Sequence, residues 1–259
     1  MAPFAVAALV AGMIFISGLV GLLLQKVLPK PHTSDRSRDM ISSVVGTTTL
    51  LLALVLGLLI WTAYGVYTAQ KAGLQSLVSG ALQFDQALME YGPEASVGRA
   101  LLKKQANEDR RQFWGGKASA GSRPYSEALA NVSTSLANMR ERDNFLDTLQ
   151  PTTELQKRLL ATARELTTSM GQTRLAMSLQ LDNPVPWPLL AIVVSWSLLL
   201  FCGAGLLSHV NATTLTSMAF GAFSVASAIF LILELNQPYT GLFHVSPATF
   251  ERITEDLAE

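Results

Sequence analysis

The sequence predicts an all-α membrane protein that has four transmembrane helices and a helical-bundle extramembrane domain between the second and third of them. The chain of 259 residues is 49% hydrophobic and 15% charged, which is more apolar than a typical soluble protein. Its apolar residues gather in four nearly uncharged runs of about the 20 residues that a helix needs to cross a bilayer. Because these runs do not alternate between polar and apolar residues, they indicate helices rather than strands of a barrel.

The first transmembrane hairpin is expected over residues 1–67, with spans at about 4–24 and 44–67. We interpret the first run as a membrane helix rather than a cleaved signal peptide. No basic residue precedes it, and no small-residue cleavage site follows it before Lys26. A basic connector that contains prolines then separates the two spans.

One face of the second span consists of small and weakly polar residues. They recur at helical spacing and are Gly46, Thr49, Ala53 and Gly57. Small residues let another helix approach closely, which is the usual way in which helices associate in a bilayer. A pore wall with the hydroxyls of residues 47–49 at its mouth would need the same stripe. Helix packing and pore lining are therefore both open interpretations.

Residues 68–184 are expected to form the helical extramembrane domain. Apolar residues continue at steps of three and four beyond Tyr67, which predicts that the second span extends as one long helix to Glu90. Three further helices are predicted, two of them over residues 93–114 and 125–149 and the last starting at Pro151. Two of the four helices in this bundle are expected to be continuous with membrane helices.

The second transmembrane hairpin is expected over residues 185–235, with spans at about 187–207 and 212–235, and an interfacial loop and tail over residues 236–259. The last span carries small residues on one face, namely Ser217, Gly221, Ser224 and Ala228. At its end the residues that we single out are Glu234, Asn236, Pro238 and Gly241. A carboxylate at membrane depth is a functional candidate because charge is costly in hydrocarbon. The alternative is that Glu234 reaches water or caps a neighbouring helix.

Several stretches resemble the bestrophin-like family of bacterial membrane proteins, a family of unknown function. They are Arg38-Asp39, residues 44–46, residues 53–57, Tyr91-Gly92-Pro93-Glu94, residues 184–188, residues 233–242 and residues 245–247. In that family the last span usually ends in Leu-Asp-x-Pro-Phe-x-Gly, whereas here Asn236 replaces the carboxylate and Tyr239 replaces the phenyl ring. True bestrophins line a narrow neck with bulky residues of the second span, but residues 44–60 contain no phenylalanine, so no neck residue is transferred. The resemblance implies a homo-oligomeric, anion-selective channel whose helical domain is cytoplasmic.

The sequence contains no motif for catalysis or metal binding, so we expect no enzyme, no cofactor and no metal. The net charge of the chain is zero, so the sequence lacks the net positive charge that is typical of proteins that bind nucleic acids. The expected partners are the lipid bilayer, further copies of the chain and inorganic ions. The leading hypothesis is a homo-oligomeric ion channel or pore. The alternative is a non-conducting, membrane-anchored sensor or scaffold whose helical domain binds a partner.

The expected location is the bacterial inner membrane, but the side of the helical domain stays open. Basic residues near the span ends are most numerous between Lys26 and Met40, which favours a cytoplasmic connector and a helical domain outside. The resemblance implies the opposite orientation.

Overall fold

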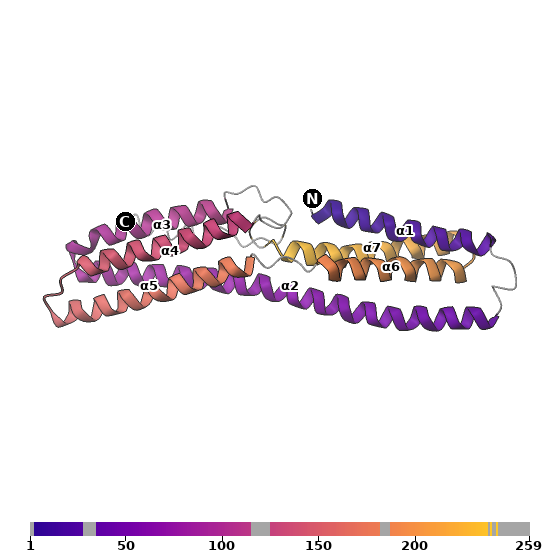
Figure 1. The fold of residues 1–259 in the computed structure, drawn as a ribbon, viewed down its shortest axis with the longest axis horizontal. Coiled ribbons are helices and arrows are strands. Elements are labelled where there is room, and N and C mark those ends of the chain that lie inside the picture. The colour runs from indigo at the N-terminus through magenta and orange to yellow at the C-terminus, as the bar shows by residue number, and fades with distance from the viewer. Residues whose placement is uncertain are drawn as a thin grey trace. The chain divides into compact units, whose positions relative to one another are not determined.

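All regular secondary structure is helical within the residues that the computed structural model describes, which are 3–27, 35–114, 125–181, 187–237, 239 and 242 (Figure 1). The elements in chain order are α1 (Pro3–Val27), α2 (Asp35–Tyr91), the 3-10 helix η2 (Pro93–Ala95), α3 (Ser96–Trp114), α4 (Tyr125–Thr148), α5 (Glu154–Leu181), α6 (Trp187–Leu207) and α7 (Ala212–Leu235). Four of these helices, α1, α2, α6 and α7, contain a stretch long and apolar enough to cross a membrane. The prediction of an all-α membrane protein with four spans is confirmed.

The chain forms two compact units, one of Met1–Gly65 with Pro184–Asn236 and one of Val66–Asn183 with Gln237–Glu259. In the first unit α1 packs against both α6 and α7. The crossing of α1 with α6 leaves no room for side chains. A Cβ on Gly21 would lie 2.0 Å from the carbonyl oxygen of Cys202, and one on Gly205 would lie 2.3 Å from that of Gly18. Small residues at such a crossing are what allow membrane helices to associate closely.

The helix α2 is a single helix of 57 residues, far longer than one span needs. Its end at Tyr91 confirms the predicted extension of the second span to about Glu90. Gly92 follows with a φ of 124°, a backbone conformation that favours glycine because it has no Cβ. Pro93, which cannot donate a backbone hydrogen bond, then begins η2.

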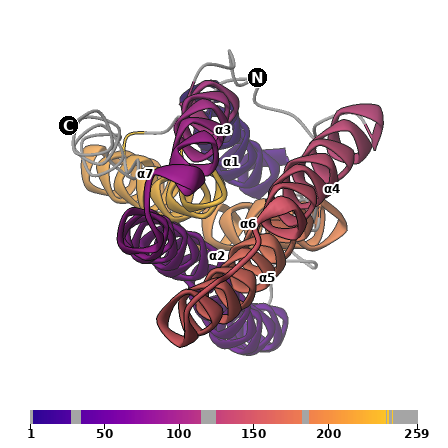
Figure 2. The ribbon, with the colours of Figure 1, turned by 90° about the vertical axis from the view of Figure 1, so that its left-hand side faces the viewer.

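The second unit is a bundle in which α3 packs against α4 and α4 packs against α5, as the end-on view shows (Figure 2). Its apolar core contains Phe84 and Leu88 of α2 together with residues of every other helix in the bundle. Methionines of α5 fill spaces left by glycines of α2. A Cβ on Gly80 would lie 2.8 Å from Cγ of Met170.

Two helices of the bundle were expected to be continuous with membrane helices. The helix α2 is one of them, whereas residues 182–186, between α5 and α6, lie outside the described residues. The buried face of α7 includes Met218, Ala222, Ala226 and Ile229.

Candidate functional site

Of the four candidate spans, the one in α2 is the least covered by other helices of the protomer. Only 11% of its most apolar window is buried, compared with 28% to 44% in the other three. The predicted stripe of Gly46, Thr49, Ala53 and Gly57 is exposed at every position. A Cβ added to Gly46 or Gly57 would meet no atom of the described residues within 4 Å. The stripe, which we call the uncovered flank, is therefore exposed along its length in the protomer.

The threonine hydroxyls of this segment bond back to their own helix. Thr47 Oγ1 donates to the carbonyl oxygen of Ser43 at 3.0 Å, and Thr49 Oγ1 donates to that of Val45 at 2.8 Å. Such bonds satisfy the hydroxyl hydrogens within the helix. The hydroxyls therefore add polarity to an apolar surface without adding a fixed charge.

The face of α2 that turns towards the protomer carries a continuous row of buried residues. We call it the buried row, and it consists of Leu52, Leu59, Ala63, Gln70, Leu74, Leu77, Phe84, Leu88 and Tyr91. Their steps of three, four and seven keep them on one side of the helix. At about 100° per residue, Thr49 and Ala53 lie roughly 60° and 100° around the helix from Leu52. The uncovered flank therefore begins beside the buried row.

Gln70 is the amide within the buried row, and its side chain is 0% exposed. Its Nε2 donates to the carbonyl oxygen of Met177 at 3.0 Å and to Oε1 of Gln180 at 3.1 Å, both near the end of α5. Its Oε1 accepts a hydrogen bond from the Tyr239 hydroxyl at 2.8 Å. Both amide hydrogens and the carbonyl oxygen are thus engaged, as a fully buried amide requires.

The motif at the end of the last span contributes Tyr239 to this contact. Tyr239 is buried within the apolar core of the second unit, although its hydroxyl remains hydrogen-bonded. Glu234 is also buried, at 4% exposed, in the last turn of α7. Asn236 follows as the C-cap, and its Nδ2 donates to the carbonyl oxygen of Ile232 at 2.7 Å. Pro238 and Gly241, the other two predicted positions, lie outside the described residues.

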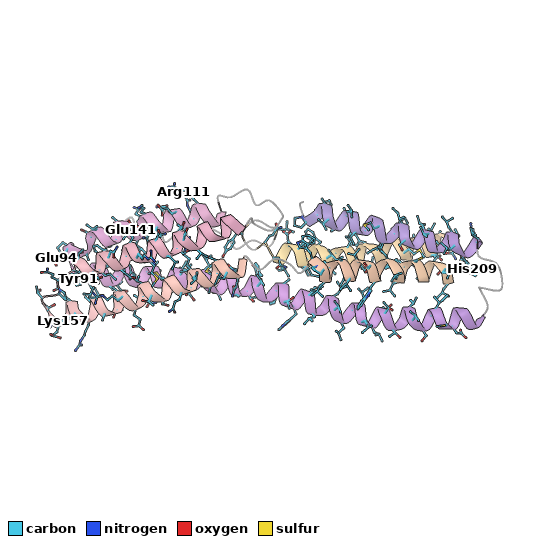
Figure 3. The ribbon with its side chains drawn as sticks, viewed as in Figure 1. Tyr91, Glu94, Arg111, Glu141, Lys157 and His209 are labelled. Atoms are coloured by element: carbon cyan, nitrogen blue, oxygen red, sulfur yellow. The ribbon has the colours of Figure 1, made fainter. Side chains whose placement is uncertain are left out.

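A second glutamine joins α2 to α5 at the opposite end of the bundle. Gln156 Nε2 donates to the carbonyl oxygen of Tyr91 at 3.2 Å. Figure 3 shows Tyr91 and Glu94 at the same end of the bundle as Lys157, where α2 ends and α5 begins. Side-chain amides therefore fix α2 against α5 at both ends of their contact, and the methionine–glycine contacts lie between them.

The bundle also contains buried charge. Arg174 of α5 forms an ion pair with Asp109 of α3 at 2.5 Å and donates through Nε to Ser135 of α4 at 2.9 Å. Arg142 of α4 is 8% exposed and donates to Oε1 of Gln105 at 2.6 Å. Burial raises the pKa of the Asp109 carboxyl to about 6, although Arg174 and Arg142 oppose this shift. Burial likewise lowers the pKa of Arg142.

Sequence reasoning missed the Gln70 contact and the buried charges. Gln70 could have been noticed as a polar residue at a buried position of a regular apolar pattern, but its partner Tyr239 is 169 residues away along the chain. Within the described residues, no group of three or more His, Cys, Asp or Glu side chains is arranged to hold a metal ion.

Comparison with known proteins identifies the family. A model of the Bestrophin-like domain matches residues 12–250. No curated protein matches the chain.

Solved structures share the fold. A tyrosine-to-alanine variant of a bacterial Bestrophin homologue from Klebsiella pneumoniae matches with a TM-score of 0.68 at 14% identity, covering 94% of this chain and 97% of that chain. A leucine-to-threonine variant of a Klebsiella pneumoniae Bestrophin homologue matches with a TM-score of 0.66 at 14% identity and the same coverage. A structure described as a membrane protein with a proline-to-alanine substitution matches with a TM-score of 0.68 at 15% identity, again with the same coverage. Since the family model covers nearly the whole chain, this multi-pass membrane protein belongs to the Bestrophin-like family.

Proposed function

We propose that this protein is a homo-oligomeric ion channel of the bacterial inner membrane and that the uncovered flank of α2 lines its conduction path. The observation that carries the proposal is the lack of cover on that flank. The other three spans bury a larger share of their apolar windows, whereas the α2 span leaves small and hydroxyl-bearing residues open along one side.

The same observation favours several copies of the chain. One flank of one helix cannot enclose a path, and no atom of the described residues lies within 4 Å of a Cβ position built on Gly46 or Gly57. A ring of α2 segments from further copies would close the wall, because small residues permit close approach of helices in a bilayer. The fold shared with bestrophin homologues supports this arrangement.

The composition of the segment favours anions as the conducted ions. Residues 44–67 contain no acidic side chain, whereas cation channels commonly use rings of Asp or Glu. Threonine hydroxyls supply polarity at one end of the segment. The bestrophin resemblance points to the same selectivity.

Ion flux in liposomes tests the proposal. We expect the purified protein to carry chloride down a gradient, to carry little potassium, and to have a mass in detergent that is a multiple of 27.9 kDa. Gly57→Leu should lower the flux about tenfold or more, because a bulky side chain narrows the path. The matched control is Gly12→Leu on α1, since Gly12 also meets no described atom within 4 Å.

The alternative function is a membrane-anchored sensor or scaffold that does not conduct. The continuity of α2 from the span into the bundle suits signal transmission as well as conduction. Absence of flux in the wild type under every gradient, pH and calcium level tested would reject the channel and favour this alternative.

A further inference from the structure

The hydrogen bonds of Gln70 join three segments that lead to three different spans. Gln70 itself follows the α2 span. Met177 and Gln180 lie in the last two turns of α5, just before the sequence enters α6, and Tyr239 comes four residues after the end of α7. One side chain thus holds the segments that continue the second span, precede the third and follow the fourth.

The contact is well suited to fix the rotation of α2 about its own axis. Gln70 lies in the buried row. Its planar amide group can form hydrogen bonds only with partners that lie near the plane of its two N–H donors and its oxygen. Because α2 continues without a break from Asp35 to Tyr91, its rotation at position 70 also sets which side chains lie on each flank at position 57. Those positions are about 20 Å apart along the helix.

We propose that Gln70 is a positioning residue of the conduction path, which through Tyr239 and the last turns of α5 sets the rotation of α2 and so the flank that faces the path. This inference rests on the proposed function for its consequence, but the rotation itself is measurable without any flux. Replacing Tyr239 by phenylalanine removes only the hydroxyl that donates to Gln70.

The test compares Tyr239→Phe and Gln70→Leu, each combined with Cys202→Ser and a reporter cysteine in α2. The reporters are Gly57→Cys on the uncovered flank and Leu59→Cys in the buried row. The measurement is the rate at which a small thiol reagent modifies each reporter in the oligomer in liposomes. We expect both substitutions to change the ratio of the two rates about fivefold, the factor that corresponds to the roughly 1 kcal/mol of a typical hydrogen bond.

Tyr67→Phe is the control, because it removes a hydroxyl from the same helix outside this contact. Gln70→Leu with Tyr239→Phe should change the ratio no more than Gln70→Leu alone, since the two groups act as one unit. An unchanged ratio in both single variants overturns the inference, and so does a lower melting temperature with an unchanged ratio. A changed ratio in a protein that carries no ions would support the positioning role and reject the proposed function. If the protein conducts ions, Tyr239→Phe and Gln70→Leu should both change the open probability, and the two changes should have the same sign.

Discussion

The two halves of α2 have different surroundings, although they belong to one helix. In the membrane half, Leu50 and Leu54 are 73% and 68% exposed. In the bundle half, Phe84 and Leu88 are 0% and 2% exposed. The bundle half is stabilised by contacts within the protomer. In the membrane half, the residues outside the buried row are left for lipid and, in the proposed assembly, for further copies of the chain.

The bundle that surrounds this half of α2 contains a buried ion pair between Arg174 and Asp109. Removing Arg174 by Arg174→Met should lower the free energy of unfolding by about 3–5 kcal/mol, because the Asp109 carboxylate would lose its buried partner. Thermal unfolding in detergent measures the effect. The control is Lys157→Met, which breaks an ion pair with Glu154 whose side chains are 57% and 80% exposed and should cost at most about 0.5 kcal/mol. Equal losses in the two variants would show that the buried pair does not support the bundle.

The bundle should also respond to pH through Asp109. Its pKa is raised from 3.8 to about 6, so the folded protein holds this proton more tightly than the unfolded chain does. The stability that Asp109 contributes is therefore fully present below 3.8 and is lost as the pH rises through about 6. At about 1.4 kcal/mol per pKa unit, the loss is at most about 3 kcal/mol. Melting temperatures of the wild type and Asp109→Asn between pH 4 and 7 measure it. The wild type should lose stability relative to the variant as the pH rises, and the opposite trend would contradict the raised pKa.

A matched pair of glycines separates the two halves directly. Gly80→Leu should cost about 1–3 kcal/mol or more, because Met170 already occupies the space beside Gly80. Gly57→Leu should leave the folding of the protomer unchanged, since no described atom lies within 4 Å of its Cβ position. Thermal unfolding of the two variants in the same detergent makes the comparison. A loss for Gly57→Leu as large as that for Gly80→Leu would mean that the membrane half is packed as tightly as the bundle half.

The regular parts of this fold follow from local pattern. The length of α2 was predictable because apolar residues continue at helical spacing from the span to Tyr91, and Gly92 and Pro93 stop the helix there.

The contacts between distant segments could not be predicted in the same way. Gly18, Gly21 and Gly205 look like any other glycines of an apolar run, and only the crossing of α1 with α6 shows why they lack side chains. The pairing of Gln70 with Tyr239 joins two segments whose proximity no local pattern encodes. The uncovered flank was visible in the sequence as a stripe, but its lack of cover within the protomer required the structure.

The most direct test of the central claim places single cysteines along α2 in a Cys202→Ser background and measures chloride flux before and after a charged thiol reagent. Thr49→Cys and Ala53→Cys should lose most of their flux on modification, because a charged group would then stand in the path. Gly12→Cys on α1 should keep its flux, although it is equally open to the reagent within the protomer. Flux that survives modification at both α2 positions would show that the uncovered flank does not line the path.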